Sequence, residues 1–415
     1  MSLSMTRQVM PLDEVRFYQK PRVVVFDYFD PTATIHSEIE HQHEEELITH
    51  LSDSEDYDKN RAEPLSDELC EVVPKNADWM LTSFPTCNLF HEEDIPNHLL
   101  YEKTRIKTHG YWRDVWVLPD TSTHSFKQIA LKTLRFEHNY TDQNYERHRR
   151  DALAYDRLTS SPNVVNMYGY CGQSGLYEYS VDGTLADRLE EHITATMDVE
   201  NQMVDKSGRG DDSTARLLDP VEKLQIAHQV ALTLADVHDV DAIRDSRGRI
   251  ISAAIVHADI KSDQFIYFNG HYKLNDFNRC RFTRRKVSES ILVDGDGEPC
   301  GFTVQRNPSV YRSPEEYSFQ EETEKIDIYS MGNIFYTLLT DREPWEGMEE
   351  KAVQQMIIAG DIPRLPESKV KSSDFVDVTL RTLMQQCFMH DPSKRPRART
   401  VANIIAEALA LHRRA

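Results

Sequence analysis

The sequence lacks several features that mark particular protein classes. It has no apolar run of about eighteen residues, and its opening residues lack the apolar core of a signal peptide. Its six cysteines are far apart and form no C-x-x-C pair, which argues against zinc. Their number is typical of reduced thiols and leaves a disulfide open. Basic residues are in deficit, at 48 against 69 acidic, so the net charge of −21 argues against nucleic-acid or anionic-membrane binding. We therefore expect a cytoplasmic, monomeric protein without a membrane segment.

The N-terminal region, 1–86, is acidic and lacks aliphatic periodicity, as in HSEIEHQHEEELITHLSDSED, and we predict that it is disordered. From residue 87 the pattern changes. Alternating β-branched and aromatic residues in RIKTHGYWRDVWVLPD and KQIALKTLRF predict antiparallel strands. A helix is expected at QNYERHRRDALAYDRL and two further strands at VVNMYGYC and GLYEYS. These segments make up a predicted small β-rich lobe over 87–182.

The remainder, 183–415, is predicted to be mostly helical, with a polar surface insertion at about 194–214. Its best-marked helix follows Asp219, which can cap the first turn. Pro220 suits that turn, and Glu222 completes a capping box. The predicted fold class is α+β and bilobal, with a small antiparallel β lobe before a larger helical lobe.

Two short stretches carry acidic residues suited to phosphate chemistry, HADIKSDQF (257–265) and LNDF (274–277). Phosphoryl transfer needs a group that orients the acceptor hydroxyl, a carboxylate for magnesium and a cation for the phosphates. Asp259, Asp276 and Lys261 could supply these roles. One such aspartate alone could be an ordinary loop residue, whereas two at this spacing, with a lysine between them, favour a functional site.

Six motifs, in family order over roughly 105–411, resemble those of eukaryotic protein kinases. HADIKSDQ resembles the H-R-D-x-K-x-x-N catalytic loop, DFN resembles D-F-G, and IALK resembles V-A-I-K. SPE resembles A-P-E, DIYSMG resembles the D-x-W-S-x-G helix start, and DPSKRP resembles the segment whose arginine pairs with the A-P-E glutamate. Lys261, two residues after Asp259, is similar to serine/threonine kinases rather than tyrosine kinases.

The resemblance implies ATP and magnesium (Mg2+) as cofactors and a protein hydroxyl as acceptor, although the substrate protein is unknown. Asp259 would accept or orient the hydroxyl proton, Lys261 would neutralise the γ-phosphate, and Lys132 would hold the α- and β-phosphates. Asp276 would bind magnesium. Gln264, in place of the family's asparagine, would be the second metal ligand, with the same amide chemistry and a longer reach.

The resemblance also implies a nucleotide site built from a glycine-rich loop, a strand, a helix carboxylate and a hinge. Tyr177 would occupy the gatekeeper position beside the hinge. The implied nucleotide-site residues are Gly110, Val115, Ala130, Lys132, Asp151, Glu178, Tyr179 and Gln264. Away from this site, Glu315 and Arg395 would form a buried structural pair.

The glycine-rich loop departs most from the family pattern. THGYWRDV keeps only Gly110, while Thr108 and Arg113 replace the other glycines. Glycines there let backbone amides approach phosphates closely, so nucleotide affinity is expected to suffer. Arg113 could contact a phosphate, but we expect a solvated charge.

The helix carboxylate is also unusual. Asp151 stands where the family has the glutamate that pairs with the strand lysine, and its shorter side chain would need a closer approach to Lys132. Glu146 is an alternative, but it lies about 140° away around a helix. Both could instead be surface charges.

Two further changes bear on function. Ala258 replaces the H-R-D arginine, so switching by an activation-segment phosphate is expected to be absent. Asn278 replaces the glycine of D-F-G, and asparagine tolerates left-handed backbone angles, so the turn can form. Three functions stay open: an active serine/threonine kinase, a pseudokinase that binds nucleotide or protein as a scaffold, and a kinase of a small molecule or sugar. The retained charged groups favour the first.

Overall fold

The computed structural model describes most of the region in which the sequence predicts order, together with one short turn before it. The described residues are 78–81, 105–119, 128–204, 217–285, 299–304 and 309–413. Residues 64–133 and 140–415 belong to one compact unit, to which the following description refers. The segment 134–139 belongs to a separate unit, within which Arg135 and Glu137 form an ion pair.

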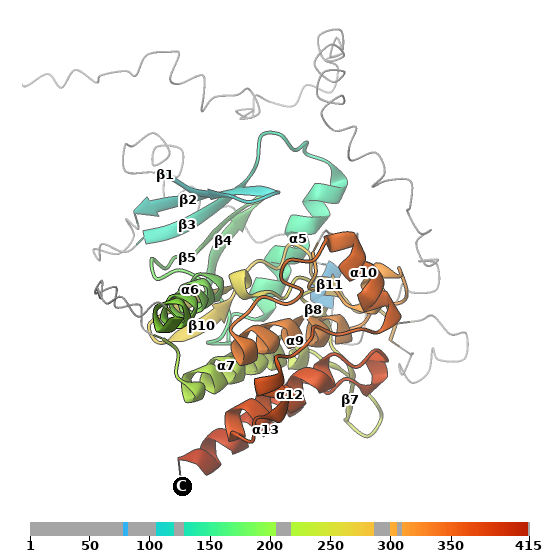
Figure 1. The fold of residues 1–415 in the computed structure, drawn as a ribbon. Coiled ribbons are helices and arrows are strands. Elements are labelled where there is room, and N and C mark those ends of the chain that lie inside the picture. The colour runs from blue at the N-terminus through green and yellow to red at the C-terminus, as the bar shows by residue number, and fades with distance from the viewer. Residues whose placement is uncertain are drawn as a thin grey trace, which may run out of the picture. The chain divides into compact units, whose positions relative to one another are not determined.

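A five-stranded sheet forms the first part of the fold, in the spatial order β1-β2-β3-β5-β4 (Figure 1). The pairs β1–β2, β3–β5 and β4–β5 are antiparallel. Its strands are β1 (Arg105–His109), β2 (Arg113–Pro119), β3 (Gln128–Leu134), β4 (Met167–Cys171) and β5 (Ser174–Glu178). Because side chains alternate along a strand, one face carries Leu131 and Leu176 in an apolar cluster, while Ala130 and Lys132 point to the other face.

Helix α5 (Asp142–Arg157) packs against β4 (Figure 1). It begins where Thr141 accepts a hydrogen bond from the backbone of Asn144, and this cap satisfies one otherwise unpaired donor. The short turn η3 (Asp78–Leu81) packs on α5, where Arg149 donates to the carbonyl oxygen of Met80 at 3.0 Å. Met80 is buried, so the disorder predicted for 1–86 does not extend over this turn. Residues 1–77 lie outside the described residues.

The second part of the fold is mostly helical, and α7, α9, α12 and α13 pack on one another (Figure 1). Its longer helices are α6 (Leu185–Val204), α7 (Pro220–Asp239), α9 (Lys325–Thr340), α10 (Glu350–Ala359), α12 (Phe375–Cys387) and α13 (Ala398–His412). The shorter helical segments are η4 (Ser262–Gln264), α8 (Pro314–Tyr317), α11 (Glu367–Lys371) and η5 (Pro392–Lys394). The predicted capping box of α7 is confirmed, with reciprocal hydrogen bonds between Asp219 and Glu222. Helix α6 continues to Val204, into the segment predicted as an insertion.

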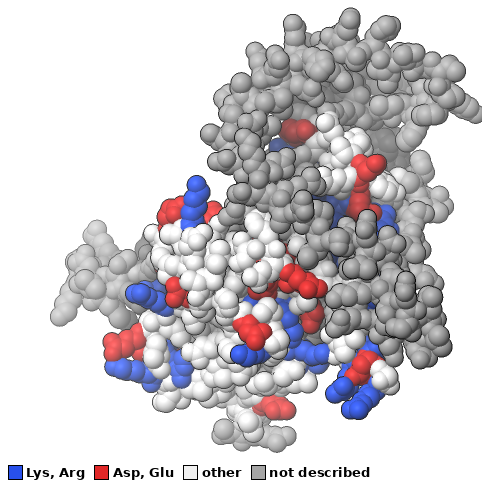
Figure 2. Space-filling view, turned by 90° about the vertical axis from the view of Figure 1, so that its right-hand side faces the viewer, with Lys and Arg blue, Asp and Glu red and all other residues white. Residues whose placement is uncertain are grey.

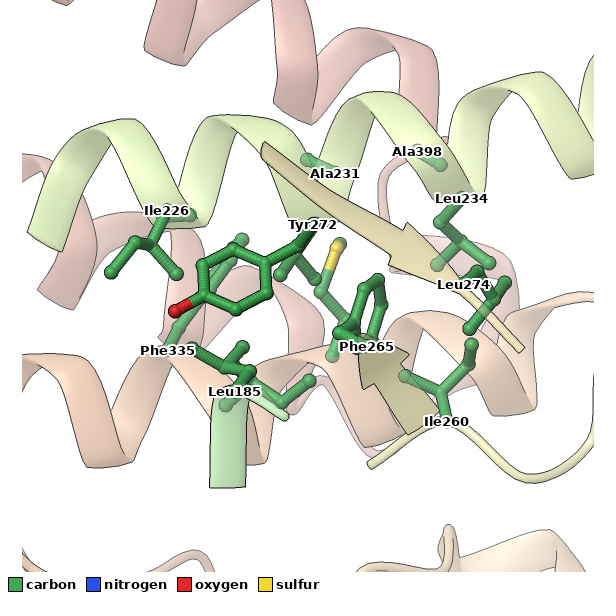
Figure 3. Close-up of a cluster of buried hydrophobic side chains, with 14 of the residues drawn as sticks. Leu185, Ile226, Ala231, Leu234, Ile260, Phe265, Tyr272, Leu274, Phe335 and Ala398 are labelled. Atoms are coloured by element: carbon green, nitrogen blue, oxygen red, sulfur yellow. The ribbon is translucent and has the colours of Figure 1, made fainter. Parts of the chain in front are cut away.

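Short strand pairs hold the segment that contains the candidate site. β9 (Phe265–Phe268) and β10 (His271–Leu274) form an antiparallel hairpin, and β8 (Ile255–Val256) pairs with β11 (Arg281–Phe282). A further pair joins β6 (Ile243–Arg244) and β7 (Ile250–Ser252). Phe265 and Leu274 lie in the core among Ile260 and Leu234 (Figure 3). Burial of such side chains stabilises the fold by roughly 1.5–3 kcal/mol each, which fixes the loops between them.

The expected α+β class is confirmed by the small sheet and the larger helical part. Among the described helices, none is long and apolar enough to cross a membrane. Cys171 and Cys300 are disulfide-bonded, which is the alternative that the sequence left open, whereas Cys280 and Cys387 are free and buried. On the face shown in Figure 2, the described acidic and basic residues are interspersed.

Candidate active site

The backbone that leads to Asp259 is fixed by a buried carboxylate on α9. Asp327 is 1% exposed and accepts hydrogen bonds from the backbone N–H groups of His257 and Ala258, both at 2.8 Å. His238 from α7 contacts the same carboxylate at 3.0 Å. These contacts hold Ala258 in the left-handed region at φ 59°, an unfavourable conformation for alanine that concentrates at functional sites. Asp259 therefore sits on rigid backbone.

Asp259 is a buried carboxylate surrounded by donors. Gln264 donates to its Oδ2 at 3.2 Å, and the guanidinium of Arg312 donates to its Oδ1. Burial alone raises the pKa of Asp259, but the charges of Arg312 and Arg279 outweigh it and lower the pKa to about 2. The carboxylate is thus ionised at neutral pH and can accept a hydrogen bond from a hydroxyl.

Lys261 stands apart from this buried network. Its Nζ pairs with Asp263 at 2.7 Å, and its side chain is 36% exposed. A partly exposed lysine on a flexible stem can reorient toward an anion at little energetic cost. Its position beside Asp259 is compatible with the role that the sequence predicts.

Lys132 does not form the expected pair with Asp151. Its Nζ donates to Asn275 Oδ1 at 2.9 Å and lies 4.9 Å from the centre of the Tyr177 ring. Tyr155 donates to the same Asn275 oxygen at 2.9 Å. Burial lowers the pKa of Lys132, whereas the nearby carboxylate of Asp276 raises it, and the net direction is downward.

Asp151 pairs instead with Arg113, and the expectation of a solvated Arg113 is wrong. Arg113 is 4% exposed, and its Nη1 lies 2.8 Å from Asp151 Oδ2. Tyr177 donates to the same oxygen at 3.0 Å. Asp151 is fully buried, so it is not a surface charge, whereas Glu146 is partly exposed and pairs with Arg149. The side chain that pairs with the helix carboxylate therefore comes from β2 rather than β3.

The same arginine reaches Asp276. Arg113 Nη2 lies 3.3 Å from Asp276 Oδ1, and the backbone N–H of Asp276 donates to Tyr155 at 2.8 Å. Burial alone raises the pKa of Asp276. The positive charges of Lys132 and Arg113 lower it by more than burial raises it, so the carboxylate stays ionised. Asp276 itself takes the left-handed angle at this turn, with φ 65°, and Asn278 does not. The left-handed backbone angle therefore falls on Asp276, two residues before Asn278, the position where the sequence suggested it.

The remaining predicted nucleotide-site residues lie on the sheet and the chain that follows it. Gly110 turns the chain between β1 and β2, where an added Cβ would lie 3.0 Å from the carbonyl oxygen of Arg113. Ala130 is buried, and the half-buried Val115 and Tyr179 pack against the same core cluster. Glu178 ends β5, and its side chain pairs with Lys273 at 2.7 Å. Thr108 lies in β1, and its side chain is not described.

The predicted buried pair of Glu315 and Arg395 is confirmed. Arg395 Nη2 donates to Glu315 Oε2 at 2.8 Å, and Nη1 donates to the other carboxylate oxygen. Both side chains are almost fully buried. Glu315 belongs to α8 and Arg395 directly follows η5, so this bidentate arginine–carboxylate pair fixes α8 against the helical core.

Four residues of the site were not predicted from the sequence: Tyr155, Asn275, Arg279 and Arg312. Asn275 directly precedes Asp276, and Arg312 directly precedes SPE, so proximity to the motifs was the available signal. For Arg113 the signal was stronger, because strand alternation places it on the same face as the buried Val117.

The residues fit a small, hard cation bound together with a phosphate. Asp276 offers carboxylate oxygens, and the side-chain amide of Gln264 offers a carbonyl oxygen, which are the ligand types magnesium prefers. In the part of the chain that the structure describes, no group of three or more histidine, cysteine, aspartate or glutamate side chains could hold a metal. Magnesium commonly binds through one or two protein ligands plus substrate phosphates, so this small set is sufficient.

Comparison with known proteins decides the family. The family model described as "Protein kinase domain" matches residues 117–404, more than half of the chain. The chain belongs to the protein kinase family. The predicted recognition is confirmed, and so is the bilobal fold, since the sheet and the helical part occupy the order that this family has.

Relatives of this kinase-family chain are distant. It is 25% identical over 265 residues to a probable LRR receptor-like serine/threonine-protein kinase of Arabidopsis thaliana, which covers 60% of this chain and 24% of that protein. It is 23% identical over 265 residues to serine/threonine-protein kinase PrkC of Bacillus subtilis, covering 63% and 34%. It is 26% identical over 284 residues to serine/threonine-protein kinase PknA of Corynebacterium glutamicum, covering 66% and 50%. The matches thus span between a quarter and a half of these relatives' lengths.

Proposed function

We propose that this protein transfers the γ-phosphate of ATP to serine or threonine hydroxyls of a protein substrate, with magnesium as the cation. The observation that carries the proposal is the ionised, buried Asp259 close to Asp276, with Lys132 and Lys261 also present. Phosphoryl transfer depends mainly on positioning and on charge, and these four groups are the charges it needs. The names of the distant relatives agree with this chemistry.

Each residue has a task that its environment supports. Asp259, held ionised by Arg312, would accept a hydrogen bond from the acceptor hydroxyl and orient its oxygen toward the phosphate. Lys132 and Lys261 would hold phosphate oxygens. Asp276 and Gln264 would hold magnesium, which supplies charge neutralisation between the phosphates when it is bound.

The test is magnesium-dependent transfer of labelled γ-phosphate by the wild-type chain and by Asp276→Asn, with a generic serine/threonine substrate and with the chain itself as acceptor. Asp361→Asn is the matched control, because Asp361 is an exposed aspartate between α10 and α11, away from Asp259, Lys261 and Asp276. We expect transfer by the wild type and the control, and none by Asp276→Asn. Transfer that survives Asp276→Asn would refute the assignment of Asp276.

A second function is favoured by one observation: Arg113 Nη2 lies 3.3 Å from Asp276 Oδ1, one of the two oxygens of the carboxylate assigned to the cation. This arrangement suits a pseudokinase that binds nucleotide or protein without turnover. In that case neither wild type nor Asp276→Asn transfers phosphate, while nucleotide binding persists in both. Transfer to water or to a small acceptor alone would point to the small-molecule alternative.

A further inference from the structure

Arg113 contacts two acidic residues that are far apart in the sequence and that the proposed function needs. Its Nη1 lies 2.8 Å from Asp151 on α5, and its Nη2 lies 3.3 Å from Asp276. Both Arg113 and Asp151 are almost completely buried. A buried carboxylate requires a cationic partner, because leaving its charge unpaired away from water costs several kcal/mol. For Asp151 that partner is Arg113.

We propose that Arg113 is a positioning residue of the nucleotide site, where it holds the α5 carboxylate in place of Lys132. The proposal rests on the proposed function, since it assigns a role within the same site. Two departures from the family pattern then explain each other. Asp151 is shorter than the glutamate of the family, and Arg113, from a neighbouring strand, supplies a longer side chain that spans the difference.

The chemistry of arginine suits this double contact. Its planar guanidinium presents several donors in a fixed fork, so one side chain can engage two carboxylates at once, whereas a lysine ammonium is a compact point charge. Arginine stays protonated in proteins at neutral pH, and this guanidinium lies 2.8 Å from Asp151 and 3.3 Å from Asp276. Arg113 is therefore a permanent charge at this place.

Because Arg113 pairs with Asp151, Lys132 does not need to pair with the helix carboxylate. It bonds to Asn275 rather than to the helix carboxylate, while Arg113 Nη2 lies 3.3 Å from Asp276 Oδ1. Asp151 retains one further acceptor, because its Oδ1 has no hydrogen-bond partner among the described residues. Loss of Arg113 should therefore disturb the phosphate and metal end of the site, through Asp276 and α5, and leave the adenine end intact.

The experiment measures equilibrium binding of ATP with magnesium, and of adenosine, to the full chain carrying Arg113→Ala, Arg113→Lys, Asp151→Asn or the double change Arg113→Ala/Asp151→Asn. We expect Arg113→Ala to weaken ATP binding about tenfold or more, the size of one lost charge-assisted hydrogen bond, with adenosine affinity within about twofold of wild type. Arg113→Lys should recover part of the loss. The double change should weaken ATP binding no more than Arg113→Ala alone, because both changes break one pair.

Arg399→Ala is the matched control. Arg399 also bridges two aspartates, Asp236 at 2.9 Å and Asp239 at 2.8 Å, but it is more exposed and belongs to α13. Its loss should leave both affinities unchanged. Thermal unfolding of every variant without nucleotide is recorded alongside. If Arg113→Ala does not fold, the double change, which leaves no unpaired buried charge, provides the same comparison.

Two results would overturn the proposal. Equal loss of ATP and adenosine affinity would show that Arg113 only supports the fold, and unchanged ATP affinity in Arg113→Ala would show that it has no role in the site. Failure of the proposed function is recognised separately, in the transfer assay: the wild-type chain would then transfer no γ-phosphate, whatever the binding measurements show. A wild-type chain that bound no ATP at all would overturn the positioning role as well.

Discussion

Removing Arg395 should destabilise this protein more than removing any exposed charge. Arg395 donates to both carboxylate oxygens of Glu315 and to the backbone carbonyls of Met389 and Lys325. The change Arg395→Met keeps much of the side-chain volume and removes every one of these bonds. Glu315, which is 3% exposed, is then left as an unpaired buried carboxylate.

The magnitude follows from that unpaired charge. Removal of one partner of a buried ion pair costs about 3–5 kcal/mol, most of it from the charge that remains. The double change Arg395→Met/Glu315→Leu removes both charges, and replacement of a whole buried pair by apolar residues is often neutral. We therefore expect the double change to cost clearly less than Arg395→Met alone.

Urea unfolding of the full chain, followed by tryptophan fluorescence, measures both variants, since Trp345 is buried in the same helical core. Lys371→Ala is the control, because Lys371 forms an exposed pair with Glu367 on α11, and such pairs contribute little. A single variant within about 1 kcal/mol of wild type, or a double variant at least as unstable as the single, would refute the reasoning.

Three further predictions concern pH, packing and thiol reactivity. Folding lowers the pKa of Asp259 to about 2, from an ordinary value near 4, so the stabilisation of about 2 kcal/mol is present above pH ~4 and is lost as the pH falls toward 2. Unfolding curves of wild type and Asp259→Asn should converge over that range, and parallel pH profiles would contradict the shift. Met80→Ala should lower the free energy of unfolding by about 2–3 kcal/mol, because Met80 is buried against the kinase core. A loss below about 0.5 kcal/mol in urea unfolding would show that η3 is not docked in solution. Burial raises the pKa of the Cys280 and Cys387 thiols to about 12, so neither should react with iodoacetamide until the chain unfolds, and labelling followed by mass spectrometry checks this.

Local patterns predicted much of the fold. The capping box at Asp219 and Glu222 depends on residues three apart, so the sequence contains the whole interaction. The strands of the sheet followed from alternation, and the helix expected at QNYERHRRDALAYDRL corresponds to α5. The boundary of α6 was harder, because polar residues such as those of 194–204 are compatible with either a surface helix or a loop. The turn η3 was missed because its order comes from contacts with α5 rather than from its own four residues.

In the candidate site too, some features could be predicted from the sequence and others could not. The identity and order of Asp259, Lys261, Asp276 and Lys132 could be predicted, because each belongs to a short motif whose spacing is visible in the chain. The burial of Arg113 could have been suspected from strand alternation. The partners of Arg113 could not be predicted, because Asp151 lies on a different element and Asp276 lies 163 residues away along the sequence.

The sequence by itself therefore determined the family pattern, the two-part α+β order and the charged groups that phosphate chemistry requires. Only the tertiary structure decided how those charges pair: Arg113 with Asp151 and Asp276, Lys132 with Asn275, and Arg312 with Asp259. The physical reason is that an ion pair depends on distance and burial. Both quantities are set when strands, helices and loops from distant parts of the chain pack together.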